Sequence, residues 1–187
     1  MTRIEMAKDF AHRAHDSINQ KRKYSGEPYW VHTDEVAQIV SEVPGATEDM
    51  IIAALLHDVV EDVTPLDKTG EFQAHVIAGL FGENVLRLVW ELTDVYTKQA
   101  RPGWNRAKRK EEEHKRQKGI SSEAMTIKLA DILSNTKSIV DNDPGFAKTY
   151  LREIDAILPH FTNGNVSLYH RVCIQVSEAL EKLNIKL

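Results

Sequence analysis

The amino-acid sequence predicts an all-α fold, in which a single domain covering residues 1–187 forms a helical bundle of about eight or nine helices. Apolar residues recur at helical spacing along most of the chain. No segment shows the alternation of a convincing strand, and no linker is long enough to split the domain. A chain of 187 residues also has the length of one domain with a core of its own.

The first half of the chain is expected to form five helices. The apolar face of the first carries Ile4, Ala7, Phe10, Ala11, Ala14 and Ile18. The second covers about residues 32–42 and stops at Pro44-Gly45. Thr47 is a candidate N-cap for the third helix, which delivers His57 and Asp58 at its end. Residues 71–81 and 82–92 follow as two consecutive helices.

The second half is expected to begin with a loop over residues 94–104 and a strongly charged, exposed helix over 105–118. Ser121 or Ser122 caps the next helix, which runs to about Val140. A turn at 143–145 leads to helices over 146–158 and 166–183. The apolar stripe of the last helix either packs internally or forms a dimer face, so a homo-oligomer stays open; it consists of Val166, Leu168, Val172, Val176 and Leu180.

Composition excludes several classes of partner. The net charge is −4 and no global basic field is present, which argues against a nucleic-acid partner. The longest apolar run, residues 51–56, is too short to cross a membrane, and the polar start lacks a secretory signal. Cys173 is the only cysteine, so no intrachain disulfide can form, and we expect a reducing, cytoplasmic setting.

Two histidines and two aspartates form a candidate metal site. They are His32, the pair His57-Asp58, and Asp131 in a distant helix. Imidazole nitrogens and carboxylate oxygens together suit Mn, Fe, Zn, Co or Ni. Such an ion lowers the pKa of a bound water and neutralises charge on a phosphate, which favours hydrolysis of a phosphate ester.

Acidic and polar residues surround these candidate ligands. Glu61 and Asp62 follow Asp58 by three and four residues, so a continued helical turn brings them beside the metal, where a carboxylate is a natural general base. The alternative is an acidic surface loop. Lys128, Asp131 and Asn135 share one helical face, and Asp131 needs a partner in so apolar a stretch. Among the other histidines, His15 is the best candidate for a supporting role.

These segments resemble the HD superfamily of metal-dependent phosphohydrolases. More narrowly, they are similar to the hydrolase domain of RelA/SpoT proteins and to the stand-alone Mesh-type small alarmone hydrolases. The resemblance extends over about residues 7–158. It is carried by residues 25–29 with His32, by 57–58 with 61–62, by 81–82 with Thr93, and by 128–135.

The resemblance implies a specific reaction. His32, His57, Asp58 and Asp131 would bind Mn²⁺, although another divalent transition metal also suits these donors. Glu61 and Asp62 would form the catalytic acidic pair that orients or deprotonates water. The family removes pyrophosphate from the 3′ position of ppGpp and pppGpp, giving GDP or GTP. The RelA/SpoT synthetase domain would lie after this region. Because 187 residues leave no room for it, the chain would be a hydrolase only.

The resemblance also implies residues that bind the nucleotide. Relatives usually carry Arg-Lys directly before their Gly-x-Pro-Tyr segment. Lys23-Tyr24 stands there in this chain and Arg22-Lys23 one position earlier, so either the loop is shifted or Tyr24 replaces a cation. The full set of candidate substrate-binding residues is Arg22, Lys23, Tyr24, Lys128, Asn135, Lys148 and Tyr150. The basic segment 98–118 either attracts phosphates or is a solvated helix face.

Two further functions remain alternatives. The first is a related phosphohydrolase that acts on another nucleotide or on NADPH. The second is a non-catalytic nucleotide-binding module that kept the fold. Glu61 and Asp62 argue against the second alternative, because a binding module has no need of a group that activates water.

Overall fold

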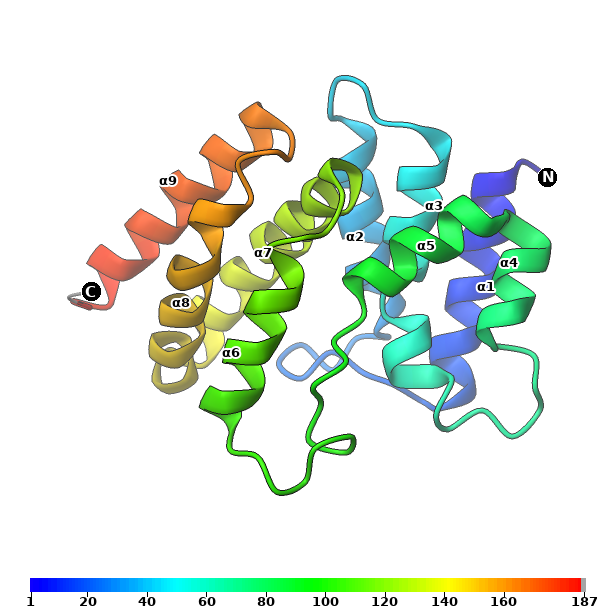
Figure 1. The fold of residues 1–187 in the computed structure, drawn as a ribbon, viewed down its shortest axis with the longest axis horizontal. Helices are drawn as coiled ribbons and strands as arrows, with labels where there is room; N and C mark the ends of the chain where they lie inside the picture. Colours follow the sequence, from blue (N-terminus) through cyan, green and yellow to red (C-terminus); the bar gives the residue numbers. More distant parts are fainter. Residues whose placement is uncertain (186–187) are drawn as a thin grey trace. The chain divides into compact units, whose positions relative to one another are not determined.

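The computed structural model describes residues 1–185 and confirms the all-α fold, with nine α-helices and no β-strand in that part of the chain (Figure 1). The helices are α1 (Arg3–Ser17), α2 (Trp30–Ser41), α3 (Glu48–Leu56), α4 (Ala74–Phe81), α5 (Glu83–Leu92), α6 (Arg106–Gln117), α7 (Ser122–Asn142), α8 (Pro144–Ile157) and α9 (Val166–Lys182). A π-helix, η1 (Val59–Val63), follows α3, and a 3₁₀ turn, η2 (Leu158–His160), follows α8.

The helices belong to two compact units, of which the first is Met1–Thr93 and the second begins at Asp94. In the first unit, α3 packs against α1, α2 and α5, and α1 also packs against η1. Edge-to-face contacts join Phe10 of α1 to Phe72 and Phe81, with ring centroids 5.3 and 5.7 Å apart. This apolar centre fixes the helices on which the candidate ligands of the first unit lie.

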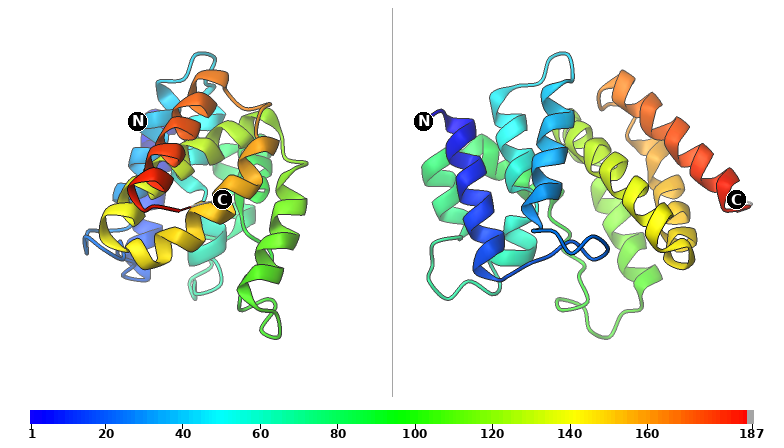
Figure 2. Two further views of the ribbon diagram at one scale, coloured as in Figure 1. Left: turned by 90° about the vertical axis from the view of Figure 1, so that its left-hand side faces the viewer. Right: turned by 180° about the vertical axis from the view of Figure 1, so that it is seen from behind.

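In the second unit, α7 packs against both α8 and α9, which also pack against each other (Figure 2). The apolar stripe of α9 is largely buried in this contact, through Leu168, Val172, Val176 and Leu180. Val166 is the exception, with 63% of its surface exposed. Most of the stripe therefore packs internally, which was one of the two alternatives for it.

Side chains at the helix ends explain several boundaries. Thr47 accepts a hydrogen bond from the backbone N–H of Met50, and Ser121 accepts one from Ala124, so both predicted N-caps are confirmed. The predicted turn at 143–145 is present as a helix break at Asp143, but Pro144 and Gly145 already belong to α8. Asp143 accepts from the N–H of Phe146, and Pro144 is the first residue of α8, because its fixed φ suits a first helical turn.

The start of α4 also differs from the prediction, which placed it at residue 71. The carboxylate of Asp67 accepts from the backbone N–H groups of Thr69, Gly70 and Phe72 at 2.8–3.2 Å. These bonds hold the chain in a turn, and α4 begins only at Ala74. A short polar side chain thus competes with the helix for the same donors.

Candidate metal centre

Three of the four predicted ligands lie together in the first unit. One donor atom from each of His32, His57 and Asp58 lies within 4.8 Å of the others. His32 is in the first turn of α2, and His57 and Asp58 directly follow α3. Both imidazoles are buried, with 1% and 3% of their surface exposed, and Asp58 is half-buried. Two nitrogen donors and one oxygen donor at this spacing suit a transition-metal ion.

Backbone contacts orient His57. Its Nδ1 lies 2.8 Å from the carbonyl oxygen of Ala54, one turn earlier in α3. A carbonyl only accepts, so Nδ1 carries the proton and Nε2 keeps the lone pair that a metal needs. The Nε2 atom lies 3.1 Å from Oδ2 of Asp58. The end of α3 therefore sets both the tautomer and the direction of this donor.

Tyr29 holds the third donor. Its hydroxyl donates a hydrogen bond of 2.6 Å to Oδ2 of Asp58. From the sequence, Tyr29 was only part of a motif and had no predicted role in the site. Its place three residues before His32 is the signal that could have identified it.

The acidic pair lies on a π-helix instead of the continued α-helical turn that we predicted. The N–H of Thr64 donates to the carbonyl of Val59 at 2.9 Å, five residues earlier. Thr64 is held in turn by its hydroxyl, which donates to the carbonyl oxygen of Phe72 at 2.6 Å. Glu61 and Asp62 are both half-buried on this wider turn. Such turns recur at functional sites.

Asp62 has an unusual environment for a carboxylate. Burial raises the pKa of Asp62 to about 6, and the nearby charge of Asp58 adds to the effect. A hydrogen bond of 2.8 Å from Nε2 of Gln20 acts in the opposite direction. A carboxylate with this pKa is suited to take a proton near neutral pH.

The fourth predicted ligand, Asp131, belongs to the second unit and lies in α7 with 7% of its surface exposed. Its carboxylate is held from both sides. Lys128 Nζ lies 2.9 Å from Oδ2, and Asn135 Nδ2 donates to Oδ1 at 2.6 Å. The shared helical face and the expected partner for Asp131 are therefore confirmed. Lys128 and Asn135, predicted to face the substrate, contact this carboxylate.

The other candidate substrate-binding residues are in two places. In the first unit, the N–H of Arg22 donates to the carbonyl of Glu27 at 2.8 Å, which closes a tight loop. Within that loop, Lys23 Nζ lies 3.2 Å from the hydroxyl of Tyr24. In the second unit, Lys148 is exposed on α8. Tyr150 is half-buried there, and burial with the charge of Asp131 raises the pKa of its phenol.

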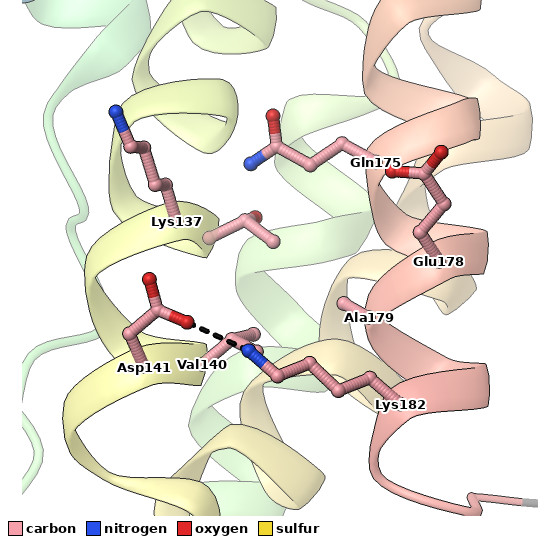
Figure 3. Close-up of a pocket in the computed structure, with 8 residues that line it drawn as sticks. Lys137, Val140, Asp141, Gln175, Glu178, Ala179 and Lys182 are labelled. Atoms are coloured by element: carbon pink, nitrogen blue, oxygen red, sulfur yellow. Dashed lines mark hydrogen bonds and ion pairs between the residues drawn. The ribbon is translucent and has the colours of Figure 1, made fainter.

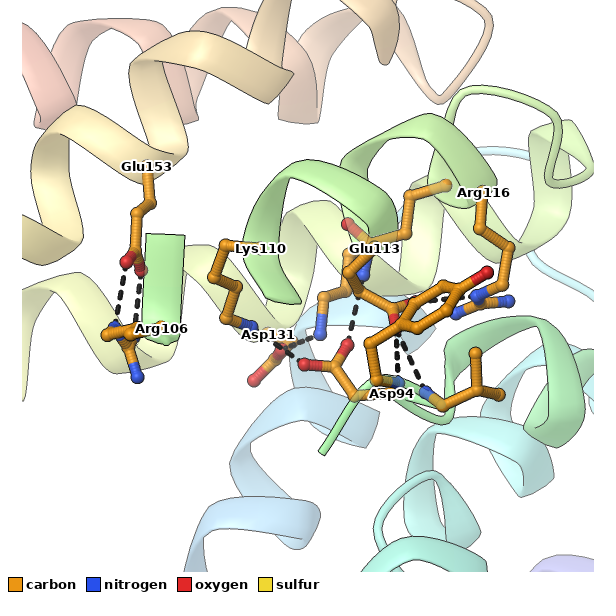
Figure 4. A network of polar contacts seen from close by, with 11 residues as sticks. Asp94, Arg106, Lys110, Glu113, Arg116, Asp131 and Glu153 are labelled. Atoms are coloured by element: carbon orange, nitrogen blue, oxygen red, sulfur yellow. Dashed lines mark hydrogen bonds and ion pairs between the residues drawn. The ribbon is translucent and has the colours of Figure 1, made fainter. Parts of the chain in front are cut away.

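A network of ion pairs engages part of the basic segment 98–118 (Figure 4). Arg106 donates two hydrogen bonds of 2.8 Å to Glu153, and Lys110 lies 2.7 Å from Asp94. Arg116 lies 2.5 Å from the buried Glu113. These three cations are therefore ion-paired within the second unit, which argues against the phosphate-attracting interpretation for them.

Glu113 and Asp94 anchor the start of this unit. The carboxylate of Glu113 accepts from the backbone N–H groups of Val95 and Tyr96 at 2.9 and 3.2 Å. Asp94 also accepts from Gln117 at 3.1 Å. Burial acts to raise the pKa of Asp94, but the nearby lysines and Arg116 outweigh it and hold that pKa below its usual value.

A separate pocket lies between α7 and α9 of the second unit (Figure 3). It is lined by Thr136, Lys137, Val140, Asp141, Gln175, Glu178, Ala179 and Lys182. Lys182 pairs with Asp141 at 2.8 Å, and Gln175 donates to the carbonyl of Leu133. Two acids balance two bases, so the pocket has no concentrated charge to attract an anion, and none of the predicted substrate-binding residues lines it.

Comparisons with known proteins identify similar sequences over most of the chain. A family model described as an HD domain matches residues 7–165. The mouse protein named guanosine-3′,5′-bis(diphosphate) 3′-pyrophosphohydrolase MESH1 is 38% identical over 136 residues, which cover 71% of this chain and 67% of that protein. A Synechocystis protein named as a probable enzyme of the same activity is 30% identical over 154 residues. That match covers 80% of this chain but only 19% of the Synechocystis protein.

A solved structure is similar as well. It was described under the words "a metazoan ortholog of SpoT hydrolyzes ppGpp and plays a role in starvation responses". The match has a TM-score of 0.79 at 26% identity and covers 100% of this chain and 98% of that one.

Among the described residues, no helix is both long and apolar enough to cross a membrane.

Proposed function

We propose a function from one premise: the chain belongs to the HD-domain family. The reaction that we propose for this chain is the metal-dependent hydrolysis of ppGpp and pppGpp at the 3′ position, giving GDP or GTP plus pyrophosphate. The observation that carries the proposal is the convergence of His32, His57 and Asp58, with Asp62 on the next turn of the chain. The names of the mouse and Synechocystis relatives supply the substrate class.

The proposed ligands are His32, His57, Asp58 and Asp131, and the proposed ion is Mn²⁺. Two imidazole nitrogens and two carboxylates fit its preference for mixed nitrogen and oxygen donors. When bound, a divalent ion would polarise the phosphate and lower the pKa of an attacking water. Asp131 is included among the proposed ligands because of the sequence pattern and the family resemblance. The HD-domain match over residues 7–165 includes parts of both units, and we propose that they act as one hydrolase domain.

Glu61 and Asp62 take the roles of the acidic pair in this proposal. Asp62 accepts the proton of the attacking water, and its raised pKa suits that task. Glu61 orients the same water from the preceding position of η1. The leaving 3′ oxygen of the nucleotide receives a proton, and the hydroxyl of water becomes part of the released pyrophosphate. Each residue would be needed for turnover and not for binding of the ion.

The nucleotide is proposed to contact two sets of residues. Arg22, Lys23 and Tyr24 offer cations and an aromatic ring to phosphate or base. In the second unit, Lys148 and Tyr150 are the proposed contacts. Lys128 and Asn135 are proposed to contact the substrate and also to orient Asp131 through their hydrogen bonds to it. The partner of the protein is thus a small nucleotide, and its expected setting is the reducing cytoplasm.

A direct assay tests the proposed reaction. Purified chain with Mn²⁺ is incubated separately with ppGpp, pppGpp, GTP, dGTP and NADPH, and the products are identified. Pyrophosphate with GDP or GTP is expected from the first two. Turnover restricted to NADPH or dGTP would overturn the assignment, and tight nucleotide binding without any turnover would favour a binding module.

Substitution of one acid tests the division of roles. Glu61→Gln should abolish hydrolysis while Mn²⁺ binds with unchanged affinity, because the amide keeps the size of the side chain but cannot act on water in the same way. Calorimetric titration of metal into the variant is the second measurement. Full turnover by Glu61→Gln would refute its assigned role.

A further inference from the structure

One side chain of the loop between α1 and α2, Gln20, reaches the acidic pair. Nε2 of Gln20 donates to Oδ2 of Asp62 at 2.8 Å. Oε1 of the same amide lies 2.7 Å from Nδ1 of His15. Three side chains therefore form a continuous hydrogen-bonded chain from α1 to η1, in the order His15, Gln20, Asp62.

The backbone holds Gln20 in place for this role. Asn19 has a left-handed φ of 50°, which asparagine tolerates, at the end of α1. The N–H of Asn19 donates to Asp16 and that of Gln20 to His15, at 2.9 and 3.0 Å, which is the Schellman pattern of helix ends. The carbonyl of Gln20 accepts from Tyr29 at 3.1 Å. Both backbone groups of Gln20 are thus fixed before its side chain is considered.

Hydrogen-bond polarity then determines where each proton lies. An ionised carboxylate only accepts, so the NH₂ group of Gln20 must face Asp62. The oxygen of the same amide consequently faces His15, which must donate from Nδ1. The charge state of Asp62 thereby selects the tautomer of a histidine two hydrogen bonds away.

His15 is built to stay neutral in this arrangement. Its side chain is fully buried, and its Nε2 has no hydrogen-bond partner among the residues that the structure describes. Burial lowers the pKa of His15 below its usual value. Its ring packs against that of Tyr29 at 4.9 Å between centroids, and Tyr29 in turn holds Asp58.

We propose that Gln20 and His15 are positioning residues for hydrolysis, which fix the carboxylate of Asp62 in the direction from which it takes the proton of water. The inference rests on the proposed function, because it concerns the reaction assigned to Asp62. His15 holds the amide, and the amide holds the carboxylate; neither residue is one of the proposed substrate contacts. Tyr29, which follows on the same loop, does the corresponding work for Asp58.

Two variants of Gln20 separate positioning from structural support. Gln20→Met keeps the length of the side chain and removes both hydrogen bonds. Gln20→Glu keeps an acceptor for His15 but places a second carboxylate against Asp62. We expect Gln20→Met to lower kcat about 10- to 100-fold, and Gln20→Glu to lower it at least as much. For both, the KM for ppGpp and the affinity for Mn²⁺ should stay within about threefold of the starting values, because neither substitution removes a proposed contact to the nucleotide or to the ion.

The matched control is Gln38→Met, an exposed glutamine of α2, whose kinetics should equal those of the starting protein. Thermal unfolding of all variants checks that they fold. A merely structural role would raise KM, weaken metal binding and lower kcat together. Unchanged kcat in Gln20→Met would overturn the proposal.

A second readout does not depend on activity. Nitrogen-15 NMR of the histidine side chains is recorded on the full chain, metal-free and with diamagnetic Zn²⁺ bound. His15 should be neutral with its proton on Nδ1, the less common tautomer, and Gln20→Met should lose that preference. A His15 protonated on Nε2 would contradict the inference. If the protein fails to hydrolyse ppGpp but shows the Nδ1 tautomer, the proposed function fails while the hydrogen-bonded chain stands.

Discussion

The hydroxyl of Tyr29 donates a 2.6 Å hydrogen bond to Oδ2 of Asp58, so a residue of the loop before α2 holds a candidate ligand that follows α3. Carboxylate ligands are commonly oriented in this way, and loss of such a partner costs about 10- to 100-fold in metal affinity or activity. Two segments that are 29 residues apart in sequence are thereby joined at the site.

Tyr29→Phe tests this contact. We expect the affinity for Mn²⁺ to fall about tenfold, because the ring remains while the donor to Asp58 is lost. Titration calorimetry on metal-free protein measures the change. Tyr169→Phe, a half-buried tyrosine of α9, is the control and should bind the ion as tightly as the starting protein. Equal affinities in both variants would mean that the hydroxyl does not support the ligand.

Lys128→Met tests what the lysine of α7 does. Its ammonium lies 2.9 Å from the buried carboxylate of Asp131. Loss of that pair should lower the free energy of unfolding of the metal-free protein by about 1–3 kcal/mol, because a largely buried charge loses a partner. Urea unfolding measures it, with exposed Lys137→Met of the same helix as the control. An unchanged stability with a raised KM would place the function of Lys128 on the substrate alone.

Gly164→Ala tests the packing of the segment before α9. A Cβ at this position would lie 2.8 Å from Cδ1 of Leu129 and 3.2 Å from the carbonyl oxygen of Phe161. Leu129 is fully buried and has little room to move, so we expect a loss of about 1–3 kcal/mol in the free energy of unfolding. Gly103→Ala has open space and should lie within about 0.5 kcal/mol of the starting protein. Similar stabilities for both variants would contradict the close approach of Gly164 to Leu129.

Acid should weaken the second unit through Asp94. Its pKa is lower in the folded chain than the ordinary value of 3.8, since Lys110 and its neighbours outweigh burial. The carboxylate therefore contributes stability above the ordinary pKa, and that contribution is lost as the pH falls through the folded pKa. Unfolding measured from pH 5 to pH 2 should show a shallower decline in Asp94→Asn. An identical slope would show that Asp94 does not carry this dependence.

Much of the fold follows from local patterns. Thr47 and Ser121 could be identified as caps because their residue types and positions suffice for the bond they make. The start of α4 could not, because it depends on how Asp67 distributes its carboxylate among backbone donors. The π-helix was missed for a related reason. Its wider turn is supported by Thr64 and Phe72, a contact that apolar periodicity does not report.

The residues of the candidate site also include some that the sequence could identify and one that it could not. His32, His57 and Asp58 were found because metals restrict ligands to few residue types. Gln20 was not, since it lies in a polar loop without periodicity and its partner is 42 residues away. An amide also has many ordinary uses, so its type alone gives no signal.

The π-helix makes the length of this segment critical. Its hydrogen bond closes over five residues, from Thr64 back to Val59, and holds one residue more than an α-helical turn. Deletion of a single residue would allow an ordinary α-helix, which is the more stable local geometry, while every later side chain would rotate by about 100°. The fold can therefore tolerate such a deletion better than the chemistry can. Divergent descendants of this chain that lost one residue between Asp58 and Glu61 would keep their helices and lose the alignment of their acids.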